Sequence, residues 1–139
     1  MHFHKQTKRL GGRKTRRGAA TIELAVCLPV MALIVFGSLS GSRMIFLRQA
    51  CVQSAYETVK ESIHVNGSQA NAIARGTAVL EFRNIQDHTI QFSPANVENL
   101  ARGTPVTVTV TVPGQANSLF AFGPFGRTSI QASATMLKE

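Results

Sequence analysis

The sequence has few charged, cysteine and aromatic residues, and each shortage excludes a class of protein. Its 139 residues contain no Trp, one Tyr and two Cys, and only 16% of them are charged. Two cysteines cannot form the disulfide framework of a small secreted domain, and a hydrophobic content of 44% excludes a disordered acidic tail. A chain of this length supports one ordinary domain, which excludes a multidomain enzyme.

The net charge of +8 is concentrated at the N-terminal end of the chain. Residues 1–18 contain seven Lys or Arg and no Asp or Glu, whereas residues 19–139 contain eight basic and seven acidic residues. A basic segment that orients a membrane helix needs no second role, so we expect no specific nucleic-acid partner.

An apolar run follows the basic segment. Residues 19–42 contain one side chain that is charged at neutral pH, Glu23, and a helix of that length is about 36 Å long, enough to cross a bilayer core of roughly 30 Å. The alternative, a buried helix in a water-soluble domain, would need more surrounding protein than this chain offers. We therefore predict a cytoplasmic leader (1–18), a transmembrane helix (19–42) and an extracytoplasmic head (43–139). The helix would cross the cytoplasmic (inner) membrane once, in contact with its lipid.

The junction between leader and apolar run is the most specific feature of the sequence. In RRGAATIEL, Gly18 directly precedes Ala19, and Glu23 is the fifth residue after the glycine. This pattern resembles the cleavage site of class III prepilins, which a membrane prepilin peptidase cuts after the glycine. The resemblance implies processing at Gly18, Ala19 and Glu23, with the glutamate pairing with the new amino group of a neighbouring subunit.

Two other targeting signals use the same region. Arg16-Arg17 could belong to a twin-arginine signal, but the residues that follow lack the bulky apolar side chains expected there. A signal peptidase could cut after the small-x-small pattern Ser38-Leu39-Ser40, but the apolar run is longer than the usual ~7–15 residues of a signal peptide.

The N-terminal helix is expected to continue beyond the membrane to residue 64. Pro29 should bend its apolar half, because proline removes one backbone hydrogen-bond donor. Neighbouring helices would cover the carbonyl that loses its partner, so we expect Pro29 and Glu23 to take part in lateral helix packing. In the second half, helical spacing predicts one apolar stripe, formed by Ile45, Val52, Tyr56, Val59 and Ile63. Asn66-Gly67-Ser68 predicts a helix stop, a left-handed turn and a new N-cap.

The rest of the head predicts one helix and three strands. Residues 69–82 form an alanine-rich helical segment, which Gly76 weakens by ~1 kcal/mol relative to Ala. Residues 89–92, 106–112 and 129–137 alternate as half-buried strands do, and the small residues of the last strand indicate a helix close to its face. The predicted fold class is α+β and pilin-like, with a mostly antiparallel three-stranded sheet.

The segment before the last strand is rich in large apolar residues for a turn. Phe120, Phe122 and Phe125 follow Leu119 and surround Gly123-Pro124. Turns usually meet water, so we predict that these residues form a contact surface or pack against the helices of the head.

No pattern in the sequence indicates catalysis, a cofactor or a metal site. The histidines are scattered, and Cys27 and Cys51 lie 24 residues apart on one predicted helix, about 36 Å, too far to pair or to share a metal. No phosphate-binding loop or nucleophile elbow is present. We expect a protein that is not an enzyme.

Taken with the leader junction, the sequences Phe36-Gly37, Arg48-Gln49-Ala50, the Val/Thr strand and the closing SATMLKE resemble those of the TadE-like family. This resemblance implies a minor pilin or pseudopilin of a tight-adherence (Flp-type) pilus, linked to adhesion or secretion. The implied partners are prepilin peptidase, other pilin-like subunits and the assembly machinery. The alternative is an uncleaved single-pass membrane protein whose head binds an envelope partner or ligand.

Overall fold

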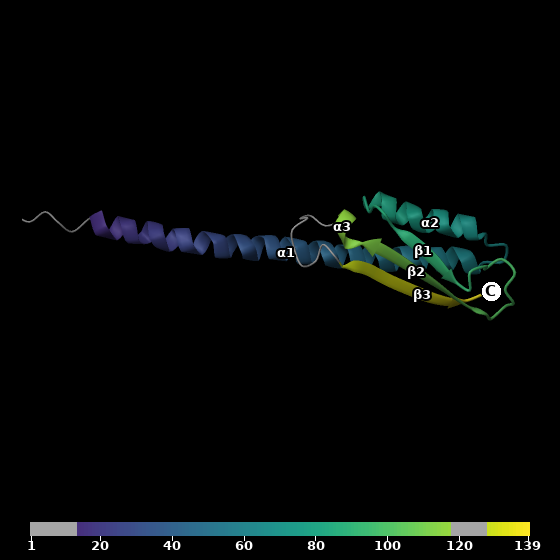
Figure 1. The fold of residues 1–139 in the computed structure, drawn as a ribbon. Coiled ribbons are helices and arrows are strands. Elements are labelled where there is room, and N and C mark those ends of the chain that lie inside the picture. The colour runs from purple at the N-terminus through teal and green to yellow at the C-terminus, as the bar shows by residue number, and fades with distance from the viewer. Residues whose placement is uncertain (1–13, 118–127) are drawn as a thin grey trace, which may run out of the picture. The chain divides into compact units, whose positions relative to one another are not determined.

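The computed structural model describes the backbone of residues 14–117 and 128–139 and the side chains from Gly18 onward within those ranges. Its elements are α1 (Lys14–Ile63), α2 (Gln69–Phe82), β1 (Thr89–Ser93), β2 (Pro105–Pro113), α3 (Gly114–Asn117) and β3 (Ser129–Leu137) (Figure 1). The α+β class, the long first helix, the second helix and the three-stranded sheet are confirmed.

The chain divides into two compact units, Met1–Ser38 and Leu39–Glu139, and α1 contributes to both. In the first unit, the large apolar side chains of α1 are exposed. Ile22, for example, is 68% exposed and Leu33 is 74% exposed. In the described part of the chain, α1 is long and apolar enough to cross a membrane. Pro29 lies inside it, and the helix is continuous on both sides of the proline. The length and the exposed apolar side chains of α1 are consistent with a membrane anchor.

The sheet of the second unit is antiparallel throughout, in the order β1-β2-β3. Val106, Val108, Val110 and Val112 on one face of β2 are fully buried, because α1 and α2 cover that face. Opposite them lie half-buried residues of the outer strands, such as Phe92 beside Val108 and Ala134 on its other side. The second face carries hydroxyl and amide side chains at most of its paired positions, with Pro105, Pro113 and Leu137 at the strand ends, so most of it meets water at little cost.

The face of α1 that builds the head core differs from the predicted stripe. Val59 and Ile63 are buried as predicted, but Ile45 (63% exposed), Val52 (50%) and Tyr56 (49%) point away from the core. The buried positions are instead mostly small: Ala50, Cys51, Ser54, Ala55, Thr58 and Ser62 join Leu47 and Val59. The stripe prediction weighted residue size, whereas close packing of α2 and the sheet requires small side chains.

Helix α2 shows why those positions are small. Gly76 is buried, and a Cβ atom there would lie 2.0 Å from Thr58 Oγ1 and 3.2 Å from Ser54 Oγ. The Ser54 hydroxyl donates to the Gly76 carbonyl at 2.9 Å. Gly76 thus lets the two helices approach closely, which outweighs its poor helix propensity.

The turn between the helices uses a different residue from the one expected. Asn66 takes the left-handed conformation with φ of 71°, while Gly67 is required because a Cβ atom there would lie 2.6 Å from the Glu61 carbonyl oxygen. Ser68 is the N-cap, and its side chain makes no capping bond.

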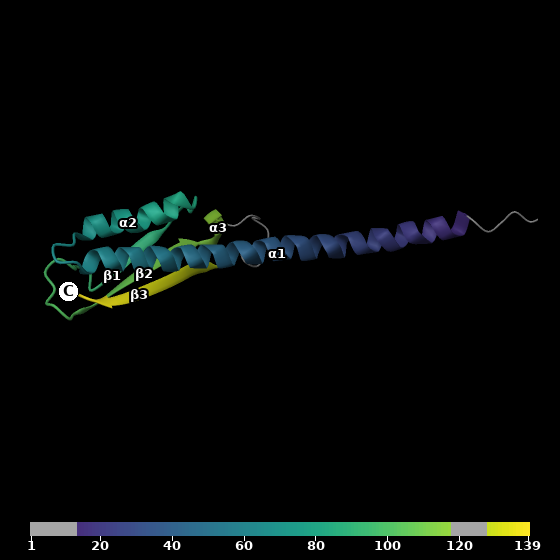
Figure 2. The ribbon, with the colours of Figure 1, turned by 180° about the vertical axis from the view of Figure 1, so that it is seen from behind.

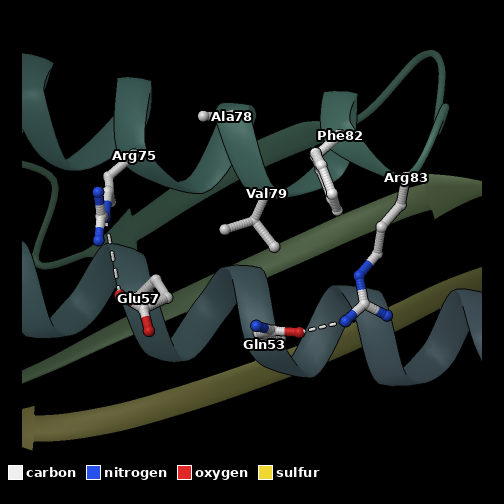
Figure 3. A pocket seen from close by; sticks show the side chains of 7 residues that line it. All are labelled: Gln53, Glu57, Arg75, Ala78, Val79, Phe82 and Arg83. Atoms are coloured by element: carbon white, nitrogen blue, oxygen red, sulfur yellow. Dashed lines mark hydrogen bonds and ion pairs between the residues drawn. The ribbon is translucent and has the colours of Figure 1, made fainter.

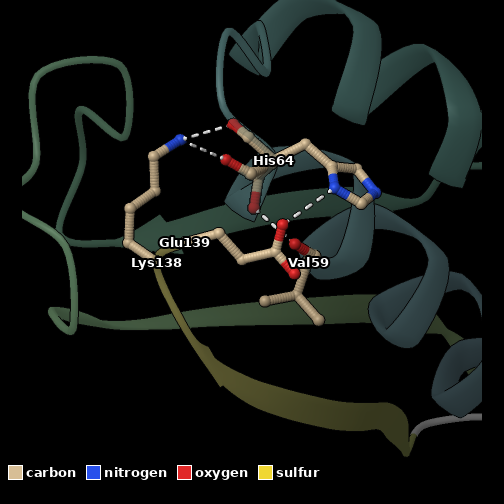
Figure 4. A network of polar contacts seen from close by, with 5 residues as sticks. Val59, His64, Lys138 and Glu139 are labelled. Carbon is tan, nitrogen blue, oxygen red and sulfur yellow. Dashed lines mark hydrogen bonds and ion pairs between the residues drawn. The ribbon is translucent and has the colours of Figure 1, made fainter.

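The C-terminal residues hold the end of α1 (Figure 4). Buried Lys138 donates through Nζ to the carbonyl oxygens of Ser62 at 2.8 Å and His64 at 3.1 Å. Glu139 Oε2 lies 3.3 Å from His64 Nδ1, and its backbone N–H donates to the Ile63 carbonyl at 3.1 Å. A cation on the last carbonyls of a helix is favourable, since it satisfies groups that have no helical partner.

Candidate processing site and head surfaces

The predicted processing residues lie in the first turns of α1. Gly18, Ala19 and Glu23 are exposed, and outside the local helix backbone no described atom would lie within 4 Å of a Cβ placed on Gly18. In the described part of the chain, no side chain or backbone group pairs with the Glu23 carboxylate. An ionised carboxylate without a partner near the end of an apolar helix costs free energy in lipid, and a cation from outside the subunit would reduce that cost.

Two further predictions are only partly addressed by the structure. Pro29 is exposed on α1 within the apolar segment, where its lateral partner would have to come from another helix. The segment with Phe120, Phe122 and Phe125 lies outside the described residues, so its role as a contact surface stays a prediction.

A groove between α1 and α2 is the main polar feature of the head that the sequence patterns missed (Figure 3). Arg75 Nε lies 3.8 Å from Glu57 Oε2, and Arg83 Nη2 donates to Gln53 Oε1. Because the polar groups pair across the groove, they link the two helices and leave little free charge for a ligand. Only the antiparallel arrangement of the helices brings these distant residues together, so no local pattern could have indicated them.

Two arginines, Arg43 and Arg83, pack against Phe46 at the C-terminal end of α2. The guanidinium carbons of Arg43 and Arg83 lie 5.6 Å and 5.2 Å from the centre of the Phe46 ring, which is cation–π distance. Arg43 Nε also donates to the Asn117 carbonyl at 3.2 Å. These contacts tie α2 and α3 to the start of the head portion of α1, so they serve the fold.

Three titratable side chains of the described part of the head, His64, His88 and Cys51, show how such groups are placed. In the described ranges, no three His, Cys, Asp or Glu residues are grouped as metal ligands. His64 is exposed beside Glu139, and His88 faces Thr77 at 3.3 Å with a buried Nδ1 that has no partner. Burial raises the pKa of the Cys51 thiol to about 11, which keeps it protonated and unreactive at neutral pH.

Comparison with known proteins matches residues 18–60 to the model of the TadE-like protein family. The match begins at Gly18 and ends within the head portion of α1, so it covers the junction, the apolar segment and the small-residue face. Comparisons with curated proteins and with solved structures gave no match. The family suggests a pilus-associated protein, which implies association with pilus components. The predicted family resemblance is therefore confirmed, and residues 18–60 of this chain are a TadE-like segment.

Proposed function

We propose that the protein is a minor pilin or pseudopilin that takes part in assembling a tight-adherence pilus. The observation that carries the proposal is the junction at Gly18: an exposed glycine, a Glu23 five residues later that pairs with none of the described residues, and a family match that starts at that glycine. The role is structural, without catalysis.

Prepilin peptidase would cut between Gly18 and Ala19 and remove the basic leader. The exposed glycine supports this step, because it presents no side chain to obstruct the peptidase. Cleavage creates an α-amino group at Ala19, and on a neighbouring subunit this cation is the partner that Glu23 lacks among the described residues of its own chain. Cleavage and lateral assembly are then coupled through one ion pair in a low-dielectric environment.

The orientation follows from the charge distribution. The basic leader keeps the N-terminus in the cytoplasm, and the head from residue 43 onward lies on the other side of the inner membrane. A helix with exposed apolar side chains and no core contacts in its first unit supports anchoring in lipid and later packing with other pilin-like helices.

Processing is tested by replacing Gly18 with Ile in the native host and measuring the intact mass of the membrane-extracted protein. We expect the wild type to lack residues 1–18 and Gly18→Ile to retain them. Gly12→Ile is the matched control, since the fifth residue after Gly12 is Arg17, and it should be cleaved normally. Retention of Met1 in the wild type beside an active prepilin peptidase would favour the uncleaved single-pass protein, and an N-terminus at Gly41 would indicate signal peptidase.

The role of Glu23 is tested by Glu23→Ala in the same host. We expect membrane insertion and cleavage to continue, with at least about a tenfold loss of co-purification with other pilin-like subunits, because the terminal amine loses its counter-charge. Thr21→Ala, a neutral change two residues away, is the control. Unchanged co-purification of Glu23→Ala would remove the ion pair from the mechanism.

A further inference from the structure

The two edges of the sheet differ in how they are protected against pairing with another strand. The β1 edge is five residues long and is directly followed by Pro94, which has no N–H to donate. The β3 edge is nine residues long (SIQASATML) and contains no charge, no proline and no glycine. In the part of the chain that the structure describes, no backbone group pairs with the outer side of β3. A long, neutral edge of this kind is a template for an added strand.

The sequence of β3 is self-complementary about Ser133. If a second β3 aligns antiparallel with Ser133 opposite Ser133, then Ala132 meets Ala134, Gln131 meets Thr135 and Ile130 meets Met136. Each pair joins residues of the same face, because side chains alternate with a period of two. At these positions hydroxyl and amide groups meet on one face and small or apolar groups on the other, while the outermost pair sets the Ser129 hydroxyl opposite the Leu137 side chain. No like charges oppose each other at any position.

A groove beside the edge provides a place for one of these side chains. It has a volume of about 370 Å³ and is lined by Met44, Ile45, Arg48 and residues 128–131. Ile45 is 63% exposed there, and Ile130 is almost fully buried. In the alignment about Ser133, the second copy's Met136 lies opposite Ile130, on the face that α1 covers. The second Met136 would therefore enter the groove, and a flexible thioether side chain fits such irregular apolar space.

We infer that the β3 edge binds the β3 edge of a second copy of this chain, which joins the two heads into one six-stranded antiparallel sheet. The backbone hydrogen bonds of the edge supply affinity. Insertion of the second copy's Met136 side chain into the groove fixes the register of the two strands. Such an interface is isologous and closed, so pairing stops at the dimer.

The direction of β3 decides which copies can pair. The Gly114 N–H donates to the Thr128 carbonyl, and Arg43 holds Asn117, so β3 starts near the beginning of the head portion of α1. Lys138 holds Ser62, so β3 ends near the end of α1, and the two elements run in the same direction (Figures 1 and 2). Antiparallel pairing places the two entry points at Leu39 at opposite ends of the dimer. The head portions of the two α1 helices therefore run in opposite directions in the dimer, and this contact is separate from the lateral assembly proposed through Glu23.

Cysteine cross-linking of the full chain in detergent tests the register. In a Cys27→Ser background, Ser133→Cys lies on the two-fold axis, where opposed Cα atoms are about 4.5–5.5 Å apart, within disulfide range. We expect a disulfide-linked dimer under mild oxidation. Gln131→Cys alone should remain uncross-linked, because its symmetry mate lies four residues further along the strand. A mixture of Gln131→Cys and Thr135→Cys should cross-link. Absence of a Ser133→Cys dimer, or equal cross-linking of Gln131→Cys alone, would overturn the inference.

A charge on the edge tests the pairing itself. Ser133→Lys puts two ammonium groups opposite each other in the dimer, and we expect its dissociation constant in analytical ultracentrifugation to rise by at least about tenfold. Gln91→Lys on the protected β1 edge is the matched control and should leave the constant unchanged. Head melting, followed by circular dichroism, reports on folding in both variants. A folded Ser133→Lys variant that dimerises like the wild type would contradict the inference, whatever the outcome of the Gly18 and Glu23 experiments.

Discussion

The two parts of helix α1 differ in which side chains they expose and which they bury. From residue 18 to 38 the helix exposes large apolar side chains, and from residue 39 to 63 it buries small ones, such as Ala50 and Ser54 at 0% exposure. Its large head residues Ile45, Val52 and Tyr56 stay exposed. Large apolar side chains are therefore exposed along both parts of α1, whereas small side chains mark the surface that meets the rest of the head.

This difference follows from the side-chain shapes that lipid and the packed head can each accommodate. Lipid adapts to side chains of any shape, so large apolar groups are favourable wherever they lie on the helix. A sheet and a second helix have fixed shapes, and close approach to them requires small residues at the points of contact. Matched substitutions in the two parts of the chain test this comparison.

The largest effect is expected for Leu80→Ala in α2, compared with Leu33→Ala in the first part of α1. Leu80 is fully buried against α1 and the sheet, so its loss leaves a cavity and should cost about 3 kcal/mol, roughly 15 °C in Tm. Leu33 is 74% exposed, and its substitution should leave head melting unchanged. Melting of the full chain in detergent, followed by circular dichroism, measures both. Equal losses would contradict the division into two surfaces.

A second comparison uses the two free cysteines. Burial raises the pKa of the Cys51 thiol from 9.0 to about 11, so between these pH values the unfolded chain ionises at this position and the folded chain does not. This contribution is fully present below pH 9 and is lost as the pH rises to about 11, a decrease of about 2–3 kcal/mol.

The measurement is the difference in stability between the wild type and Cys51→Ala at pH 8 and at pH 11. All other side chains are the same in both proteins, so their contributions to the pH dependence cancel. Cys27→Ala, in the exposed part of α1, is the control and should keep the wild-type slope. If Cys51→Ala showed that same slope, burial of the thiol would not govern the pH dependence.

The smallest effect is expected for Gly76→Ala, compared with Gly37→Ala. The added methyl group at position 76 would collide with Thr58 Oγ1, whose hydroxyl donates to the Ser54 carbonyl at 2.7 Å. We expect a net loss of about 1–2 kcal/mol despite the better helix propensity of alanine. At Gly37 no atom lies within 4 Å of the added Cβ, so stability should stay the same or increase.

A double variant sharpens this comparison. Thr58→Ala removes the colliding hydroxyl, so Thr58→Ala/Gly76→Ala should be more stable than Gly76→Ala alone when both are unfolded in urea. Additive losses in the double variant would show that the two residues do not compete for the same space.

Local patterns predicted most of the fold correctly. The second helix was predicted at its observed bounds, and the three strands were predicted to within one residue, because strict alternation around β-branched residues is a strong local signal. The predicted processing at Gly18 and Glu23 also depends on a linear pattern alone, and it stays a prediction. The apolar stripe of α1 was predicted wrongly, because periodicity shows which residues share a face but not which face has a partner.

The sequence by itself determined the apolar segment, the junction, the elements and the resemblance of residues 18–60 to the TadE-like family, since each depends on neighbouring residues or on total hydrophobicity. Only the tertiary structure decided that α1 packs through its small residues, that Gly76 is a point of helix contact and that Lys138 holds the end of α1. It also decided that one edge of the sheet is protected and the other is not. These properties join residues far apart in the chain, and their energies depend on shape and distance, which a one-dimensional pattern does not contain.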